Sequence, residues 1–213
     1  MRYFVKTPWL LKKIFSSYCW RIDTSEKILY LTFDDGPHPT VTSFVLDELK
    51  KHRATATFFC IGKNVAAFPD VYKRILEEGH IVGNHTHNHL NGWKTNNHVY
   101  LEDISKASGY IDSSLFRPPY GRIGFLQSKR LSLFMKKPYA KVVMWDVLSG
   151  DFDLSISPEH CAENVLEYSK PGSIIVFHDS SKAFPRIKYA LPKTLQFFGE
   201  KGYRFLSLPA FGG

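Results

Sequence analysis

The sequence predicts an α/β protein built on parallel strands. Short runs rich in β-branched and aromatic residues recur along the 213 residues, and most are followed by a segment whose apolar residues repeat at helical spacing. Acidic residues and histidines also gather directly after several of these runs, at the sheet edge where parallel α/β folds place their active residues. These observations favour a parallel sheet or a (β/α) barrel in one domain.

Each predicted element rests on its pattern of apolar residues. The strands are predicted over residues 27–33, 55–60, 80–83, 141–146, 173–177 and 203–206. The helices are predicted over residues 41–50, 71–78, 99–111, 158–168 and 187–198. Pro158 suits the first turn of its helix, because an amide hydrogen has no partner there, whereas Pro192 falls inside the last helix. The Asn-rich stretch 89–98 is predicted to be a loop at the cleft rim.

The charge balance is basic, with 28 Lys and Arg against 20 Asp and Glu and a formal net charge of +8. An anionic partner such as a membrane surface or an acidic glycan would explain this, but an ordinary basic surface is the favoured explanation. No long Lys/Arg block supports nucleic-acid binding, and we predict no nucleic-acid partner. The three cysteines are far apart and odd in number, which predicts free thiols instead of a disulfide framework.

The first 20 residues resemble a secretion signal only loosely. Lys6, Pro8, Lys12 and Lys13 interrupt any apolar core, and no small-residue cleavage site follows. The apolar residues of this stretch repeat at helical spacing: Leu10, Leu11, Ile14, Phe15 and Tyr18. We favour a helix docked on the domain over an interfacial membrane helix, and we expect a cytoplasmic or membrane-peripheral protein.

Two histidines and two adjacent carboxylates indicate a metal site. His85 and His89 would lie on one face of a helical turn, so both imidazoles could reach one ion, although such a pair is weak evidence alone. Asp34 and Asp35 follow the first strand, and two adjacent carboxylates are costly to bury unless a positive charge is present. One Asp with two His leaves room for water on the metal, and the second Asp is free to act as a general base. A plain Asp-Asp-Gly-Pro turn with surface histidines is the alternative.

Other strand ends carry further acid–base candidates. His178 follows an apolar strand and has the pKa range of a proton donor, with Asp151 or Asp179 available to orient it. Asp146 ends the 141–146 run, and Asp151 follows it. Arg117 begins a rigid Arg-Pro-Pro-Tyr-Gly segment and could hold a catalytic carboxylate ionised. The alternatives are a core histidine and an incidental loop arginine.

These residues fall into five ordered motifs, and on them the chain resembles the NodB-type polysaccharide deacetylases, carbohydrate esterase family four. The resemblance spans about residues 27–208, and its motifs lie at residues 32–37, 85–89, 117–121, 145–152 and 176–179. It implies a deformed (β/α) barrel with an incomplete strand ring. It also implies one catalytic deacetylase domain over 27–213, after a basic amphipathic segment over 1–26.

The resemblance also implies a role for each matching residue. Asp35, His85 and His89 would hold the metal, which is expected to be zinc, with cobalt, nickel or manganese as alternatives. Asp34 would be the general base, positioned by Arg117, and His178 the general acid, tuned by Asp151. The Tyr120 N–H would stabilise the oxyanion. The reaction would be hydrolysis of an N-acetyl or O-acetyl group on a glycan.

The chain departs from the family pattern near the expected substrate pocket. Leu148 and Phe152 replace the Asp and Trp of the fourth motif, and Val176 replaces the Leu of the fifth. Phe152 and Val176 are expected to wall the acetyl pocket, with Pro119 and Trp145 as further substrate contacts. These changes leave the substrate open while the catalytic set is complete.

Three other functions compete with a glycan deacetylase. The same scaffold resembles hydrolases of non-sugar amides, and only the substrate pocket would separate the two. A glycan-binding protein with a vestigial metal site would not need Asp34, Arg117 and His178 together. An iron oxygenase with two His and one carboxylate usually uses another scaffold. The glycan and the oligomeric state are not readable from the sequence.

Overall fold

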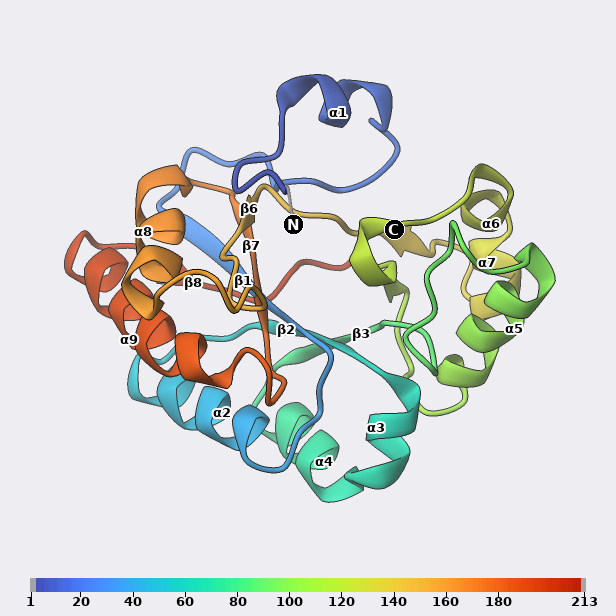
Figure 1. Cartoon of the computed structure of the whole chain (residues 1–213), viewed down its shortest axis with the longest axis horizontal. Coiled ribbons are helices and arrows are strands. Elements are labelled where there is room, and N and C mark those ends of the chain that lie inside the picture. The colour runs from blue at the N-terminus through green and yellow to red at the C-terminus, as the bar shows by residue number, and fades with distance from the viewer. Residues whose placement is uncertain (1–2, 212–213) are drawn as a thin grey trace.

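The computed structural model describes residues 3–211 and shows a parallel sheet curled into an incomplete barrel, with helices packed on its outside (Figure 1). The strand order is β5-β4-β3-β2-β1-β7-β6, and β8 pairs with β1. The strands are β1 Ile28–Asp34, β2 Thr57–Cys60, β3 Ile81–Asn84, β4 Leu115–Phe116, β5 Lys141–Val142, β6 Val147–Leu148, β7 Ile174–His178 and β8 Arg204–Phe205. The predicted α/β class with an incomplete strand ring is confirmed.

The helices alternate with the strands along most of the chain. They are α1 Trp9–Ile14, α2 Val41–Lys51, α3 Gly62–Ala67, α4 Pro69–Glu77, α5 Asn97–Ser108, the short 3₁₀ helix η1 Pro119–Gly121, α6 Phe125–Lys129, α7 Leu131–Met135, α8 Pro158–Tyr168 and α9 Phe184–Glu200. Helix α9 continues through Pro192, as predicted. Within residues 3–211 the longest helices fall short of the length and apolar character that a bilayer span requires.

The prediction of one strand over 141–146 is wrong. Pairing with β4 ends at Val142, and the chain then crosses to the other edge of the sheet, where it resumes as β6. The carbonyls of Val143 and Met144 accept hydrogen bonds from the Arg117 side chain instead of from a neighbouring strand. Strand β4 and helices α3, α6 and α7 were not predicted, because runs of two to six residues carry too little periodicity.

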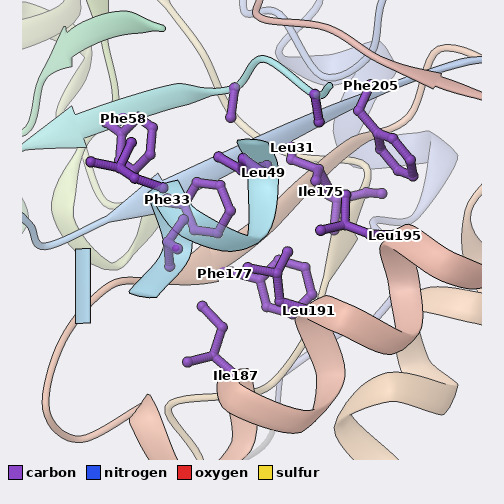
Figure 2. Close-up of a cluster of buried hydrophobic side chains, with 14 of the residues drawn as sticks. Leu31, Phe33, Leu49, Phe58, Ile175, Phe177, Ile187, Leu191, Leu195 and Phe205 are labelled. Carbon is purple, nitrogen blue, oxygen red and sulfur yellow. The ribbon is translucent and has the colours of Figure 1, made fainter. Parts of the chain in front are cut away.

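The main core lies between the sheet and helices α2 and α9 (Figure 2). Alternate residues of β1 face these helices, including Leu31 and Phe33, and both are fully buried. Because side chains alternate across a strand, Thr32 and Asp34 face the barrel interior. The same alternation on β7 places Val176 and His178 on the interior face. The β1–β7 register sets Asp34 opposite His178.

The N-terminal segment, residues 3–22, covers the gap in the strand ring. Lys6 makes an antiparallel bridge to Val147, and Cys19 makes a parallel bridge to Val143. Leu11 and Tyr18 face the body of the domain as expected for a docked helix, but Leu10 and Ile14 are exposed. The prediction of a helix docked on the domain is therefore correct for Leu11 and Tyr18 but not for Leu10 and Ile14. The three cysteines are buried and free, as predicted.

Candidate active site

The centre of the site is an aspartate–arginine pair at the end of β1. The Arg117 side chain is fully buried, and its Nη1 lies 2.7 Å from Oδ1 of Asp34. The same nitrogen donates to the Thr32 hydroxyl at 2.7 Å, and the guanidinium lies 4.1 Å from the centre of the Phe59 ring. Its Nε and Nη2 atoms donate to the carbonyls of Val143 and Met144, so the guanidinium is held in one orientation.

Thr32 was not among the predicted site residues. Its hydroxyl accepts from Arg117 and donates to the Ile175 carbonyl at 2.7 Å, so it links the arginine to β7. The signal was present in the sequence, because a residue two positions before Asp34 on a strand faces the same side.

Asp35, His85 and His89 come together next to this pair. The Asp35 Oδ1 atom lies 3.8 Å from Nε2 of His85 and 3.2 Å from Nε2 of His89. All three ligand atoms lie within 4.8 Å of one another. Ligands bound at about 2 Å in a tetrahedron would be separated by about 3.3 Å, so these distances suit one divalent ion.

The two histidines do not lie on a helical turn, and that prediction is wrong. Residues 85–89 form an irregular loop in which Thr86 and His89 have positive φ, at 64° and 57°. This backbone turns the two imidazoles toward the same point, with their ring centres 5.1 Å apart. His87, between them, faces away and stacks on Tyr110.

The donor atoms of this set are prepared for a cation. Oδ1 of Asp35 is buried and accepts no hydrogen bond. Nδ1 of His85 lies 2.7 Å from the Arg117 carbonyl oxygen, which makes Nδ1 the donor and leaves Nε2 free as a ligand. Burial lowers the pKa of His85 to about 4, so its imidazole is neutral, as metal binding requires. An unpartnered buried oxygen facing two imidazole nitrogens fits zinc or a similar ion.

His178 pairs with Asp151 on the other side of Asp34. The Nδ1 atom of His178 lies 2.7 Å from Oδ1 of Asp151, and the His178 amide donates to Oδ2 at 2.6 Å. Burial lowers the pKa of His178, but the Asp151 carboxylate outweighs this and raises it to about 10. The imidazole is therefore protonated, and its Nε2 is left to face the site.

Asp179 does not contact the His178 ring, contrary to one of the two options drawn from the sequence. Its two oxygens accept the Gly36 amide at 2.9 Å and the Thr42 hydroxyl at 2.5 Å. A Cβ at Gly36 would lie 2.0 Å from Oδ2 of Asp179, so only glycine fits this turn. Asp179 therefore holds the turn that carries Asp34 and Asp35.

Tyr120 borders the Asp35, His85 and His89 side chains from a strained turn. Its φ of 60° is in the left-handed region, which is unusual for a residue with a side chain. Its ring lies edge-on to His89 at 4.8 Å between centres. Among the described residues, no acceptor takes its amide hydrogen, whereas the next two amides bond to the carbonyls of Pro118 and Pro119. This leaves one backbone N–H free beside the site.

The remaining predicted residues lie close to residues of the site. Phe152 contacts His178 edge-on at 5.3 Å between ring centres and packs on Tyr3 at 5.1 Å. Val176 is buried on the same face of β7 as His178. Pro119 is buried in η1, and the Trp145 ring packs against Gly121. Tyr3 was not predicted, because nothing near residue 3 signals a contact with residue 152.

An apolar cavity of about 230 Å³ lies beside Tyr120. Residues of the N-terminal segment form one wall: Tyr3, Phe4, Leu11, Phe15 and Tyr18. Residues from later in the chain form the other: Trp93, Tyr120, Ile123, Met144, Trp145 and Leu148. Leu148, which replaces a family Asp, therefore faces an apolar space.

Comparison with known proteins gives consistent matches. The family model described as polysaccharide deacetylase matches residues 21–132. A peptidoglycan-N-acetylglucosamine deacetylase of Bacillus cereus is 38% identical over 188 residues, which is 84% of this chain and 66% of that protein. A second protein of that name from B. cereus is 34% identical over 195 residues, which is 89% of this chain and 90% of that protein.

A solved structure matches over nearly the whole chain. It is the Bc1960 peptidoglycan N-acetylglucosamine deacetylase in complex with 4-naphthalen-1-yl-N-oxidanyl-benzamide. The two superpose with a TM-score of 0.84 and 34% sequence identity over 95% of each chain.

Proposed function

Because this chain belongs to the polysaccharide deacetylase family, we propose that it hydrolyses the N-acetyl group of N-acetylglucosamine units in a peptidoglycan-type glycan. The NodB-type resemblance is confirmed, as is the prediction of a polysaccharide deacetylase enzyme. The proposed glycan comes from the names of the two B. cereus relatives. The proposed mechanism is supported by the geometry of this chain.

The observation that carries the mechanism is the different environment of two adjacent carboxylates. Asp34 is held by Arg117 at 2.7 Å, whereas Asp35 faces His85 and His89. One acid is therefore equipped to act as a base and its neighbour to act as a metal ligand. This division supports hydrolysis by an activated water.

Asp35, His85 and His89 would hold the metal, which we propose to be zinc, with cobalt, nickel or manganese as alternatives. A divalent ion bound there supplies a Lewis acid that lowers the pKa of a water molecule and polarises the acyl carbonyl. The Arg117 carbonyl fixes the ring of His85, so the same residue orients a metal ligand and the base.

Asp34 takes the proton of the attacking water in this mechanism. Its Oδ1 is occupied by Arg117, and no donor among the described residues occupies Oδ2, which leaves that oxygen free for the proton. The guanidinium fixes the position of this carboxylate beside the other site residues. Arg117 is thus a positioning residue for Asp34.

His178 supplies a proton to the leaving group. The amide carbon–nitrogen bond breaks, the water oxygen stays on the acetate carbon, and the sugar nitrogen leaves as an amine after taking the His178 proton. Asp151 holds the imidazole by Nδ1 and keeps it protonated. The free Tyr120 N–H is the backbone donor assigned to the oxygen that becomes negative in the transition state.

Four further residues are proposed to contact the substrate. Phe152 and Val176 lie on the His178 side, and Pro119 and Trp145 lie on the Tyr120 side. Since Leu148 and Phe152 differ from the family pattern, the acyl pocket between these two sides would differ from that of other family members.

The test is acetate and amine release by zinc-loaded protein on a matched substrate panel. The panel holds N-acetylglucosamine oligomers, peptidoglycan and an O-acetylated xylan, with chelator-treated protein as the control. We expect acetate and free amine in equal amounts from the N-acetylated glycans, and none after chelation. Acetate without amine would make the chain an O-deacetylase. No release despite tight zinc binding would favour a non-sugar amide substrate or a binding role.

A further inference from the structure

The excess of positive charge in this chain comes from two segments. Residues 3–22 and 113–145 hold eleven Lys and Arg and no Asp or Glu. The rest of the chain holds the other seventeen basic residues against all twenty acidic ones, so without these segments the chain would be slightly acidic. The net charge of +8 is therefore a property of one part of the molecule.

The two segments lie side by side in the structure. The Cys19 amide donates to the Val142 carbonyl at 2.9 Å, and the Met144 amide donates to the Cys19 carbonyl at 2.7 Å. Tyr18 and Trp20 pack into the same apolar cluster as α7. In Figure 1, α1 is at the top of the molecule with α6 and α7 at the upper right, while α4 is at the bottom. We call residues 3–22 and 113–145 together the basic apolar face.

The basic apolar face also exposes most of the large apolar side chains. Ten of the eighteen such side chains exposed among residues 3–211 belong to it, although it holds only a quarter of these residues. The first segment contributes Phe4, Trp9, Leu10, Ile14 and Phe15. The second contributes Tyr120, Phe125, Leu126, Leu133 and Tyr139. Exposed apolar groups this concentrated indicate a binding surface.

Two lysines of this face lie over aromatic rings of the same face. The Lys13 ammonium lies 5.8 Å from the Trp9 ring centre, and the Lys129 ammonium lies 5.6 Å from that of Phe125. Some of the basic residues are used internally, since Lys6 and Lys12 bind Asp146 and Arg117 binds Asp34. Others are exposed and make no ion pair with any described residue: Lys13, Lys129, Arg130 and Lys136.

We propose that the basic apolar face binds the surface of a bilayer containing anionic phospholipids. Trp, Phe and Leu side chains insert at the boundary between headgroups and acyl chains, while neighbouring Lys and Arg pair with lipid phosphates. A soluble polyanion would satisfy the charges, but it would leave Leu10, Ile14 and Leu133 in water. The apolar groups therefore decide in favour of a lipid surface.

This orientation brings the candidate active site to the membrane. Tyr120 belongs to the basic apolar face, contacts the metal ligand His89 and borders the apolar cavity. A bilayer on this face would lie beside the site, so the enzyme would act on glycan close to the membrane plane. The binding itself does not depend on the hydrolysis proposed above, and its test uses no substrate.

Vesicle flotation of the full chain measures the binding. The probes are vesicles of phosphatidylcholine alone and vesicles in which about 30% of the lipid is phosphatidylglycerol, which makes their surface strongly anionic. We expect the protein to float with the anionic vesicles, at least about tenfold more tightly than with the neutral ones, and to lose affinity as salt rises. Equal partition into both vesicles, or no flotation at all, would overturn the proposal.

Two matched pairs of variants separate the face from the rest of the surface. Leu10→Ser with Ile14→Ser removes apolar groups from the face, and Leu154→Ser with Tyr189→Ser removes exposed apolar groups outside it. Lys13→Glu with Lys129→Glu reverses two face charges, and Lys188→Glu with Lys193→Glu reverses two charges on α9. We expect about a tenfold or greater loss of vesicle affinity for the face variants, and less than a twofold change for the controls.

Heparin binding is measured alongside for every variant. Equal losses of vesicle binding in face and control variants would overturn the proposal. So would heparin binding without vesicle binding, since the face would then be a polyanion site. Circular dichroism checks the fold of each variant, and none of the four apolar residues is buried.

Discussion

The buried carboxylates of this chain differ in how completely their oxygens are bound. Asp146 has both oxygens occupied, one by Lys12 and the other by Lys6 and Ser173. Asp151 and Asp179 are likewise bound through both oxygens. At the end of β1, by contrast, Asp34 uses one oxygen on Arg117, and Oδ1 of Asp35 is buried with no hydrogen bond.

In the proposed mechanism, this difference separates acids that position other groups from acids that react directly. A buried carboxylate is costly unless its oxygens are paired, so the fully bound acids contribute to stability. A buried oxygen without a partner is unfavourable in the protein alone, and it becomes favourable only when a cation or a transferred proton arrives. Burial does not distinguish the two groups, since Asp34 and Asp146 are both buried.

The largest effect is expected from Asp34→Asn. The amide still accepts from Arg117 but cannot take a proton from water, so turnover should fall by about 10²- to 10⁴-fold. Metal stoichiometry should be unchanged, because Asp34 is not in the ligand set. Acetate release and metal content on the same preparation check both statements. Turnover within about threefold of wild type would remove Asp34 from the base role.

Substitutions in the loop 85–89 test the proposed metal ligands. His85→Ala and His89→Ala each remove one of three ligands, and metal affinity should fall by more than about 100-fold. His87→Ala is the matched control, because that side chain stacks on Tyr110 away from the set. Isothermal titration of chelated protein with zinc measures all three. Stoichiometric, tight binding in both His85 and His89 variants would refute the assignment.

Local pattern predicted which side chains lie together better than it predicted the backbone that carries them. Alternation along β1 and β7 is short-range information, and it was enough to direct Asp34 and His178 into the barrel. The spacing of His85 and His89 is compatible with a helical turn and with a loop, so the helical turn predicted from spacing alone was wrong.

Long-range contacts explain what the sequence could not supply. Asp146 ends a predicted strand and Asp151 follows the same strand, so the two look alike in sequence. They differ because the partners of Asp146 are two lysines more than 130 residues away, whereas Asp151 binds His178. Only the folded chain shows which acid faces the site.

Asp151→Asn tests whether the Asp151 carboxylate keeps His178, the proposed general acid, protonated. Without the Asp151 carboxylate, burial dominates, and the pKa of His178 should fall from about 10 in the metal-free protein. Because the folded pKa is raised, the stabilisation from this pair is complete below the ordinary histidine pKa of about 6.5 and is lost as pH rises through 10. In the variant, the alkaline limit of activity should move to lower pH.

NMR titration of the His178 imidazole in metal-free protein measures that shift directly. Asp179→Asn is the control, because Asp179 is next to His178 in sequence but its carboxylate accepts hydrogen bonds only from Gly36 and Thr42 among the described residues. An unchanged His178 pKa in the Asp151 variant would show that another group protonates the ring. A shift of equal size in the Asp179 variant would show that the effect is not specific to the pair.

The smallest effect on turnover is expected from Asp146→Asn, although its carboxylate is as buried as Asp34. The change leaves Lys6 and Lys12 without their acid, and the free energy of unfolding should fall by about 1–3 kcal/mol, since both lysines can turn to solvent. The lysines lower the pKa of Asp146, so the stability lost in the variant is present in wild type above pH about 4 and disappears below it. Turnover should stay within about threefold of wild type, because a fully bound carboxylate has no oxygen left to take a proton. Denaturant unfolding measures the stability, and acetate release measures the turnover. A loss of turnover as large as that of Asp34→Asn would mean that the number of hydrogen-bonded carboxylate oxygens does not separate reacting acids from positioning ones.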